Sequence, residues 1–239
     1  YSNTLVSATG TANSPFIPKY PSLELFKGIS IHSVQYKNAN EFANKNVLVV
    51  GGGNSGAQVL AEVSKLANTQ WVTLDEPHFL PDDVDGRYLF KEANQSYLEK
   101  STKPNKSLSN IVMVESVKEA RTRKVLHAKR PFQSFYENGI IWEDGTREAF
   151  DAVIWCTGFQ ANLKHLSRLG IVEDSKIKTQ HTRVIKEPNL WLVGYGNWTG
   201  FASATIYGVG KTARKTVEEI TTELNSLKNN IINKNLAQK

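Results

Sequence analysis

The chain has 239 residues, which at about 150 residues a domain corresponds to one large or two modest domains. Hydrophobic residues make up 40% of it, charged residues 22% and aromatic residues 10%, so a disordered or collagen-like chain is excluded. A diffuse net charge of +6 gives no reason to expect a nucleic-acid partner. No run of about 18 apolar residues predicts a membrane span, and the single cysteine excludes a disulfide framework or cysteine-rich zinc site.

The first nine residues predict a strand that leads into a Thr-Gly turn. The chain begins with Tyr1 and shows neither the basic start nor the apolar stretch of a signal peptide. We therefore expect a cytoplasmic protein whose beginning is missing from this sequence. Three prolines between residues 15 and 21 then favour extended backbone.

A βαβ unit is predicted next. Residues 46–50 form a short apolar run rich in valine, which indicates a buried parallel strand. Apolar residues recur at helical spacing between residues 59 and 67 and predict an amphipathic helix of about three turns. Residues 70–74 predict the second strand of the unit.

The middle of the chain is less regular. Residues 77–110 are polar and indicate a connecting excursion with weak helical character at 88–98, followed by a strand at 111–114. Residues 135–150 hold an Asn-Gly and an Asp-Gly turn signal between alternating apolar residues, which predicts a small antiparallel meander.

Two more buried strands are expected at residues 151–155 and 189–193. From residue 202 onward, apolar residues again recur at helical spacing and predict a long helix.

The residues after the first strand of the βαβ unit read Gly-Gly-Gly-Asn-Ser-Gly and fit the pattern G-x-G-x-x-G. In this pattern Gly51 permits the tight turn, Gly53 lets the backbone approach a pyrophosphate, and Gly56 lets the helix pack closely on the strand. The first helical turn, with Asn54 and Ser55, then directs N–H groups at the phosphates. The alternative is a glycine-rich turn that only joins strand to helix.

Asp75 lies about 20 residues beyond the glycine turn, just past the second strand. A carboxylate there would accept hydrogen bonds from the ribose hydroxyls of NAD and repel the 2′-phosphate of NADP. Arg87 and nearby lysines offer the opposite charge to that phosphate. The alternative for Asp75 is a solvated turn residue.

Phe26, Gly28, His32 and Tyr36 match F-x-G-x-x-x-H-x-x-x-(W/Y/P), shortly upstream of the glycine turn. This combination resembles the flavin-containing monooxygenases, the class B single-component flavoproteins. Residues 151–159 are similar to the family's D-x-x-x-x-A-T-G-(F/Y) motif, although cysteine replaces its alanine. The likeness is closest to a compact bacterial branch of flavoprotein oxidoreductases, some of them found beside metalloid-resistance genes.

The resemblance implies an α/β fold with two Rossmann-like dinucleotide-binding domains. An NAD(P)H domain at 41–150 would be inserted into an FAD domain made of residues 1–40 and 151–239. Family members begin with a first G-x-G-x-x-G for the FAD pyrophosphate, and this sequence contains one such motif only. We therefore expect the FAD domain to lack its first βαβ unit.

The family's motifs also imply contacts with FAD. They assign these to Thr9, Gly10, Thr157, Gly158, Asn197, Ala204 and Thr205. Asn197 stands where the family usually has an aspartate for the ribityl chain, and an amide can still hydrogen-bond a hydroxyl. The catalytic asparagine of many members has no counterpart in this sequence, so no catalytic residue and no metal ligand is assigned.

The implied function is that of an NAD(P)H-dependent flavoprotein oxidoreductase, a monooxygenase that uses FAD and O₂ on a small substrate. The family favours NADPH, and Asp75 would allow NADH as well. Two alternatives stay open, an NAD(P)H:acceptor reductase or oxidase without oxygenation, and a nucleotide-binding module without catalysis. A homo-oligomer is compatible with the sequence.

Three residues have plainer interpretations beside the functional ones. His32 is either a residue beside the nucleotide, as in the family, or a packing residue between domains. Cys156 is expected to be an inert core thiol, with a nucleophile as the alternative. Trp191, within the strand expected at 189–193, is expected to lie in the core, with a place lining the flavin as the alternative.

Overall fold

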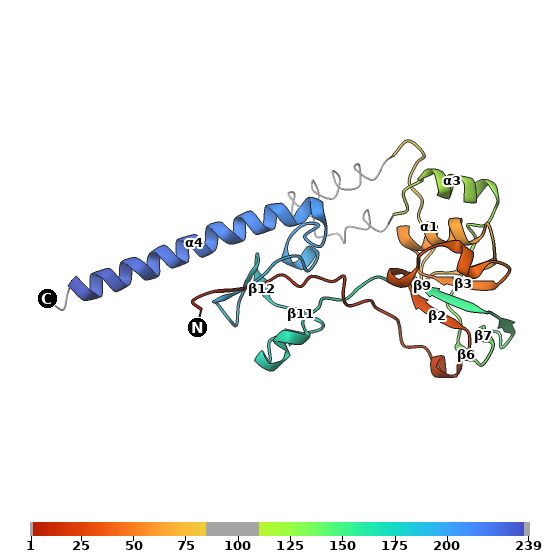
Figure 1. Ribbon diagram of the computed structural model, residues 1–239, viewed down its shortest axis with the longest axis horizontal. Coiled ribbons are helices and arrows are strands. Elements are labelled where there is room, and N and C mark those ends of the chain that lie inside the picture. Colours follow the sequence, from red (N-terminus) through yellow and green to blue (C-terminus); the bar gives the residue numbers. More distant parts are fainter. Residues whose placement is uncertain (1, 85–109, 237–239) are drawn as a thin grey trace. The chain divides into compact units, whose positions relative to one another are not determined.

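The computed structural model describes residues 2–84 and 110–236, and the chain forms two compact units (Figure 1). Unit 1 comprises Tyr1–Ser14 and Phe159–Lys239, and unit 2 comprises Pro15–Gly158. These limits differ from the domain boundaries expected at residues 40 and 150. The reason is that the strands just outside those boundaries, at 29–32 and 152–155, pair with each other inside unit 2.

Unit 2 is built on a five-stranded sheet in the order β2-β9-β3-β4-β5, and all of its strand pairs are parallel. Its strands are β2 (Ile29–His32), β3 (Asn46–Val50), β4 (Asn68–Val72), β5 (Ala128–Lys129) and β9 (Ala152–Trp155). The helices α1 (Asn54–Val63) and α3 (Glu115–Thr122) lie on one side of this sheet (Figure 1).

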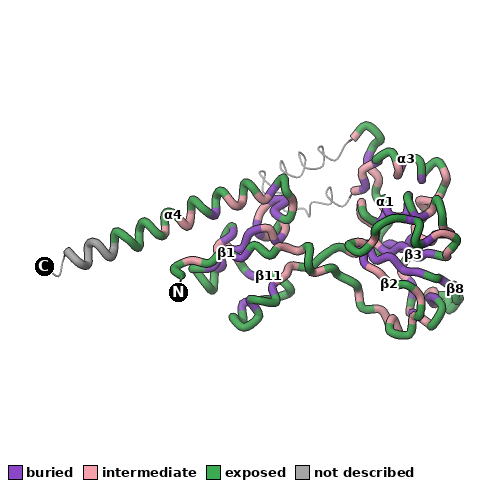
Figure 2. The backbone as a smooth tube through the Cα atoms, viewed as in Figure 1, coloured by how far each residue is buried: buried purple, intermediate pink, exposed green. Residues whose placement is uncertain are grey.

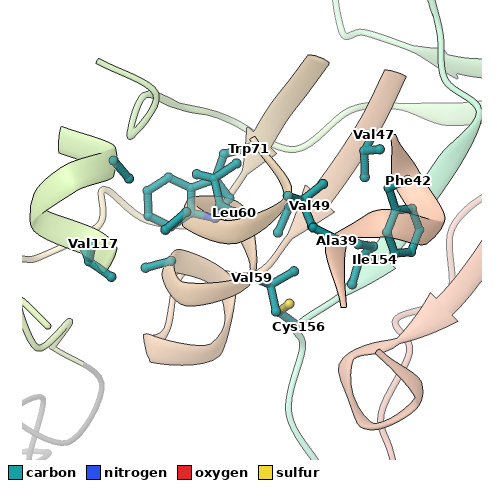
Figure 3. Close-up of a cluster of buried hydrophobic side chains, with 14 of the residues drawn as sticks. Ala39, Phe42, Val47, Val49, Val59, Leu60, Trp71, Val117, Ile154 and Cys156 are labelled. Carbon is teal, nitrogen blue, oxygen red and sulfur yellow. The ribbon is translucent and has the colours of Figure 1, made fainter. Parts of the chain in front are cut away.

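Successive side chains along each strand point to opposite faces of the sheet, as the two-residue period of a strand requires. Val47 and Val49 of β3 pack with Val59 and Leu60 of α1 and with Trp71 in one buried cluster (Figure 3). This cluster fixes α1, and therefore the glycine turn that precedes it, against the middle of the sheet.

The opposite face of the sheet is covered by the predicted meander, which is confirmed. It consists of β6 (Ser134–Tyr136), β7 (Gly139–Ile141) and β8 (Arg147–Ala149), paired antiparallel. Leu48 and Val50 of β3 pack there with Phe135 and Ile140. The short 3₁₀ helices of unit 2 are η1 (Leu23–Leu25), η2 (Ser33–Gln35) and η3 (Ala39–Phe42).

Unit 1 contains a four-stranded sheet in the order β1-β14-β13-β12. β1 (Leu5–Ser7) and β14 (Leu190–Leu192) run parallel, whereas β13 (Arg183–Val184) and β12 (Thr179–Gln180) are antiparallel to their neighbours. A second hairpin joins β10 (Val172–Glu173) and β11 (Lys176–Ile177), and the 3₁₀ helices are η5 (Lys164–Leu169) and η6 (Asn197–Thr199).

The long helix α4 (Ile206–Leu236) ends the described chain and confirms the helix predicted from residue 202 onward. Most of its described residues are exposed (Figure 2). The buried Thr216 hydroxyl donates to the carbonyl oxygen of Thr212 at 2.9 Å and therefore accepts from the Thr182 hydroxyl, between β12 and β13, at 2.6 Å. No helix among residues 2–84 and 110–236 is long and apolar enough to cross a membrane.

The strands predicted at 46–50, 70–74, 151–155 and 189–193 are confirmed within two residues at each end. The strand predicted at 111–114 is wrong, because the structure has only an isolated bridge between Phe79 and Ile111 there, followed directly by α3. The weak helix predicted at 88–98 lies outside the described residues.

Candidate functional site

The glycine turn joins the end of β3 to the start of α1, as the βαβ prediction requires. Gly51 has a φ of +132°, and a Cβ atom on it would lie 2.2 Å from the carbonyl oxygen of Cys156. A Cβ atom on Gly56 would lie 2.1 Å from the carbonyl oxygen of Gly51. Both glycines are therefore required by the packing of the protein itself.

Gly53 differs from these two glycines. Its φ of −96° and ψ of −173° are extended values that any residue can adopt, and a Cβ atom on it would meet no atom of the described residues within 4 Å. Neither backbone strain nor internal packing requires glycine at this position. The open space lies at the N-terminus of α1, where Gly53 is the N-cap and no side chain caps the helix. This arrangement fits a pyrophosphate bound by backbone N–H groups and the positive end of the helix.

The two polar residues of the motif have different environments. The Asn54 amide nitrogen donates to the carbonyl oxygen of Asn110 at 2.9 Å, and its amide oxygen accepts from the N–H of Val112 at 2.8 Å. Asn54 thus holds the segment that leads into α3. Ser55 is exposed in the first turn of α1.

At the carboxyl end of β4, Asp75 is exposed, as a residue that faces a ribose would be. Arg130 follows β5 directly, donates from Nη1 to the carbonyl oxygen of Leu74 at 3.2 Å, and pairs with the carboxylate of Glu76. Sequence analysis missed Arg130, because no strand was predicted at residues 128–129 and the contact with Leu74 depends on the pairing of β4 with β5. Arg87, the predicted partner of a 2′-phosphate, lies outside the described residues.

A groove of about 600 Å³ adjoins Arg130 on the surface of unit 2. Its lining includes the cations of Lys129, Arg130 and Arg147 and the ring of Trp142. The Lys129 ammonium lies 4.4 Å from the centroid of that ring and 3.2 Å from a carboxylate oxygen of Glu148.

The F-x-G-x-x-x-H motif ties β2 to β9. A Cβ atom on Gly28 would lie 2.6 Å from the carbonyl oxygen of Asp151, so glycine is required there by close packing. His32 is buried; its Nε2–H donates to the carbonyl oxygen of Gly158 at 2.9 Å, and its Nδ1 accepts from the N–H of Val34 at 3.2 Å. This pair of bonds fixes the neutral Nε2–H tautomer, and burial lowers the pKa of the imidazole below its ordinary value of 6.5.

The end of β9 carries the predicted flavin residues Thr157 and Gly158. The Thr157 hydroxyl donates to the carbonyl oxygen of Phe16, whose N–H donates back to the carbonyl oxygen of Gly158 at 2.9 Å. Cys156, just before them, is buried, and burial raises the pKa of its thiol to about 12. Such a thiol stays protonated near neutral pH and is a poor nucleophile.

In unit 1, Thr9 and Gly10 follow β1 at the carboxyl end of the parallel β1–β14 pair, which is the end where open α/β sheets bind ligands. Gly10 has a φ of +61°, and a Cβ atom on it would lie 3.4 Å from the carbonyl oxygen of Gly194. The turns that follow β1 and β14 are therefore in close contact.

Four side chains form a directed hydrogen-bond chain beneath these turns. The Thr9 hydroxyl donates its one proton to the carbonyl oxygen of Asn162 at 2.8 Å, so the Tyr195 hydroxyl must donate to Thr9 at 2.7 Å. Ser7 must then donate to Tyr195 at 2.5 Å, and the Nε2–H of His165 to Ser7 at 2.7 Å. These hydrogen bonds fix the orientation of the Thr9 side chain. Because the Thr9 hydroxyl donates its proton to Asn162, it has no proton to donate to a ligand.

The remaining predicted flavin residues precede α4. The amide oxygen of Asn197 accepts from the N–H of Ala202 at 3.1 Å, and the Thr205 hydroxyl accepts from the N–H of Gly208 at 3.1 Å. Ala204 is exposed between them. The Oδ1 atom of Asn197 and the hydroxyl of Thr205 thus shape the loop and the start of α4.

Comparison with known proteins supplies a family. Residues 1–194 match the model of the pyridine nucleotide-disulphide oxidoreductases. An uncharacterized oxidoreductase, CzcO of Bacillus subtilis (strain 168), is 30% identical over 226 residues, with 92% of this chain and 65% of the relative covered. Senecionine N-oxygenase of Tyria jacobaeae is 32% identical over 169 residues, which cover 69% of this chain and 29% of the relative.

Comparison with solved structures also finds flavin-dependent monooxygenases. The flavin-containing monooxygenase of Stenotrophomonas maltophilia superimposes with a TM-score of 0.82 at 45% identity, covering 92% of this chain and 63% of that one. Cyclohexanone monooxygenase with bound ε-caprolactone shares the fold, with a TM-score of 0.58 at 15% identity. The predicted resemblance to flavin-containing monooxygenases is confirmed, and the chain spans less than two thirds of the length of these relatives.

Proposed function

Since the chain belongs to the pyridine nucleotide-disulphide oxidoreductase family, we propose that it is an NAD(P)H-dependent flavoprotein monooxygenase acting on a small substrate with O₂. The proposal includes the two-domain arrangement, in which unit 2 binds the nicotinamide coenzyme and unit 1 contributes to the site of FAD. A cytoplasmic location, where NAD(P)H is supplied, belongs to the same proposal.

Gly53 carries the proposal for the coenzyme. It is a glycine that the protein needs neither for strain nor for packing, and it lies at an uncapped helix N-terminus after a buried parallel strand. Gly51 and Gly56 hold the turn and the helix in place, while the first-turn N–H groups bind the pyrophosphate. Asp75 or Arg130 then contacts the adenosine ribose at the carboxyl end of β4.

FAD supplies the oxygen chemistry when bound, and the protein supplies orientation and electrostatics. We assign to the FAD site the turns after β1 and β14, where Gly10 and Gly194 are in close contact at the carboxyl end of the parallel pair. The hydrogen-bond chain that ends at Thr9 keeps this turn in one conformation. Asn197, Ala204 and Thr205 shape the neighbouring loop.

The family also contains disulfide reductases, whose reaction needs a pair of cysteines. This chain has one cysteine, Cys156, and it is buried with a raised pKa. Within these residues, Cys156 therefore gives no support to thiol–disulfide chemistry.

The proposal is tested by supplying the protein with FAD, NADPH and ¹⁸O₂ and analysing the products. Label in an oxidised small substrate, such as an amine or a thioether, supports a monooxygenase. Coenzyme oxidation with peroxide as the only oxygen product identifies an oxidase or acceptor reductase instead. Coenzyme binding without any oxidation identifies a nucleotide-binding module.

A further inference from the structure

We propose that Arg130 selects the coenzyme by binding the adenosine 2′-phosphate of NADP(H), and that Glu76 competes with this phosphate for the same guanidinium. The inference rests on the proposed function, because it assumes that a nicotinamide coenzyme binds at the glycine turn. It adds a specificity residue that neither the motifs nor the family match assigns.

The position of Arg130 follows from strand pairing. In the parallel pair of β4 and β5, Val72 lies opposite Lys129, and the N–H of Thr73 donates to the carbonyl oxygen of Lys129 at 3.0 Å. The residues just beyond these two strands are therefore neighbours, and Arg130 reaches the carbonyl oxygen of Leu74 at 3.2 Å. The segment after the second strand of such a unit faces the adenosine ribose of a bound dinucleotide.

The charges around this segment are opposed. The carboxylate of Asp75 would repel a doubly charged 2′-phosphate, whereas the guanidinium of Arg130 would bind it through two parallel N–H donors. In the structure this guanidinium is paired with Glu76, whose side chain is 80% exposed. An exposed ion pair contributes little, so a phosphate can replace the Glu76 carboxylate.

The two other cations of the groove are engaged elsewhere. Lys129 pairs with Glu148 and covers the ring of Trp142, and the guanidinium of Arg147 lies 5.3 Å from the centroid of the Tyr136 ring. Arg130 is the cation of this groove that bonds to the backbone of the ribose-facing segment. NAD(H), which has no 2′-phosphate, would leave the pair of Arg130 and Glu76 intact.

Calorimetric titrations with adenosine 2′,5′-bisphosphate, 5′-AMP, NADP⁺ and NAD⁺ test the inference without any turnover. We expect Arg130→Ala to weaken binding of the two 2′-phosphorylated ligands by roughly tenfold to a hundredfold, and binding of 5′-AMP and NAD⁺ by less than about twofold. Glu76→Gln should strengthen binding of the 2′-phosphorylated ligands only. The matched control is Arg121→Ala, because Arg121 also forms an exposed ion pair in unit 2, with Asp82.

Two results would overturn the inference. One is an equal loss of affinity for NADP⁺ and NAD⁺ in Arg130→Ala, and the other is unchanged affinity for adenosine 2′,5′-bisphosphate. A wild-type protein that binds none of the four ligands would instead refute the proposed function. Salt provides a further readout, since the affinity for NADP⁺ should fall more steeply with ionic strength than the affinity for NAD⁺.

Discussion

We expect replacement of Gly53 by alanine to weaken binding of the nicotinamide dinucleotide while folding stays intact. The backbone at Gly53 is already extended, and the new Cβ atom would meet no atom of residues 2–84 or 110–236 within 4 Å. Removing a glycine from a compatible conformation stabilises proteins by about 0.4–1 kcal/mol, so thermal stability should be unchanged or slightly higher. The added methyl group occupies only the space assigned to the pyrophosphate.

The size of the binding defect follows from the bonds that would be lost. A pyrophosphate held away from the turn loses at least one N–H to phosphate hydrogen bond, and a bond to a charged group contributes about 1.5–3 kcal/mol. One lost bond therefore weakens binding by roughly tenfold to a hundredfold. Gly53→Val, which is larger, should weaken binding further.

Gly56→Ala is the matched control, because it adds the same methyl group three residues along. Its Cβ atom would lie 2.1 Å from the carbonyl oxygen of Gly51, so backbone atoms must move. Overpacking of this kind destabilises by about 1–3 kcal/mol, partly offset by about 1 kcal/mol from the better helix propensity of alanine. Calorimetric titration with NADPH and thermal melts compare the variants. Unchanged affinity in both Gly53 variants would refute the placement of the pyrophosphate.

Three further outcomes are expected from the structure. Because burial holds the pKa of His32 below 6.5 in the folded protein, the free energy of unfolding should fall as the pH drops from 6.5 through the folded-state pKa. Melting curves between about pH 7.5 and about pH 5 should show this decline, and it should be smaller in His32→Gln. Cys156, whose pKa burial raises to about 12, should react with a thiol reagent only after denaturant is added, and rapid labelling of the native protein would contradict its placement. Tyr195→Phe leaves Ser7 and Thr9 each without one partner and should destabilise unit 1 by about 1–3 kcal/mol, whereas an unaltered melting curve would show that the hydrogen-bond chain contributes nothing.

Elements with a strong local pattern could be predicted from the sequence. The run of valines in β3 identifies a buried strand, and the spacing of the glycines that follow identifies a tight turn. Few other local structures are compatible with either of these two patterns. By contrast, α3 was missed, because its sequence is polar and only Val117 and Ala120 of its eight residues are buried. A helix with so narrow an apolar face shows no clear period.

The candidate site divides in the same way. The packing of Gly56 against Gly51 lies within the motif, and the positive φ of Gly51 is the tight turn that the motif predicts. The use of the Asn54 side chain by residues 110–112 could not be foreseen, because it depends on a segment more than fifty residues away. Arg130 was missed for the same reason, since its contact with Leu74 exists only once β4 and β5 have paired.

The pairing of β1 with β14 has a consequence for synthesis on the ribosome. Leu5 lies opposite Leu190, whereas every strand of unit 2 lies within Pro15–Gly158. Unit 2 can therefore be synthesised in full before β14, the strand that pairs with β1, has emerged. At about 5–20 residues per second, roughly 10–40 s separate the emergence of Leu5 from that of Leu190. During this interval the β1–β14 pair cannot yet form, so the sheet of unit 1 is completed only after all strands of unit 2 have been synthesised.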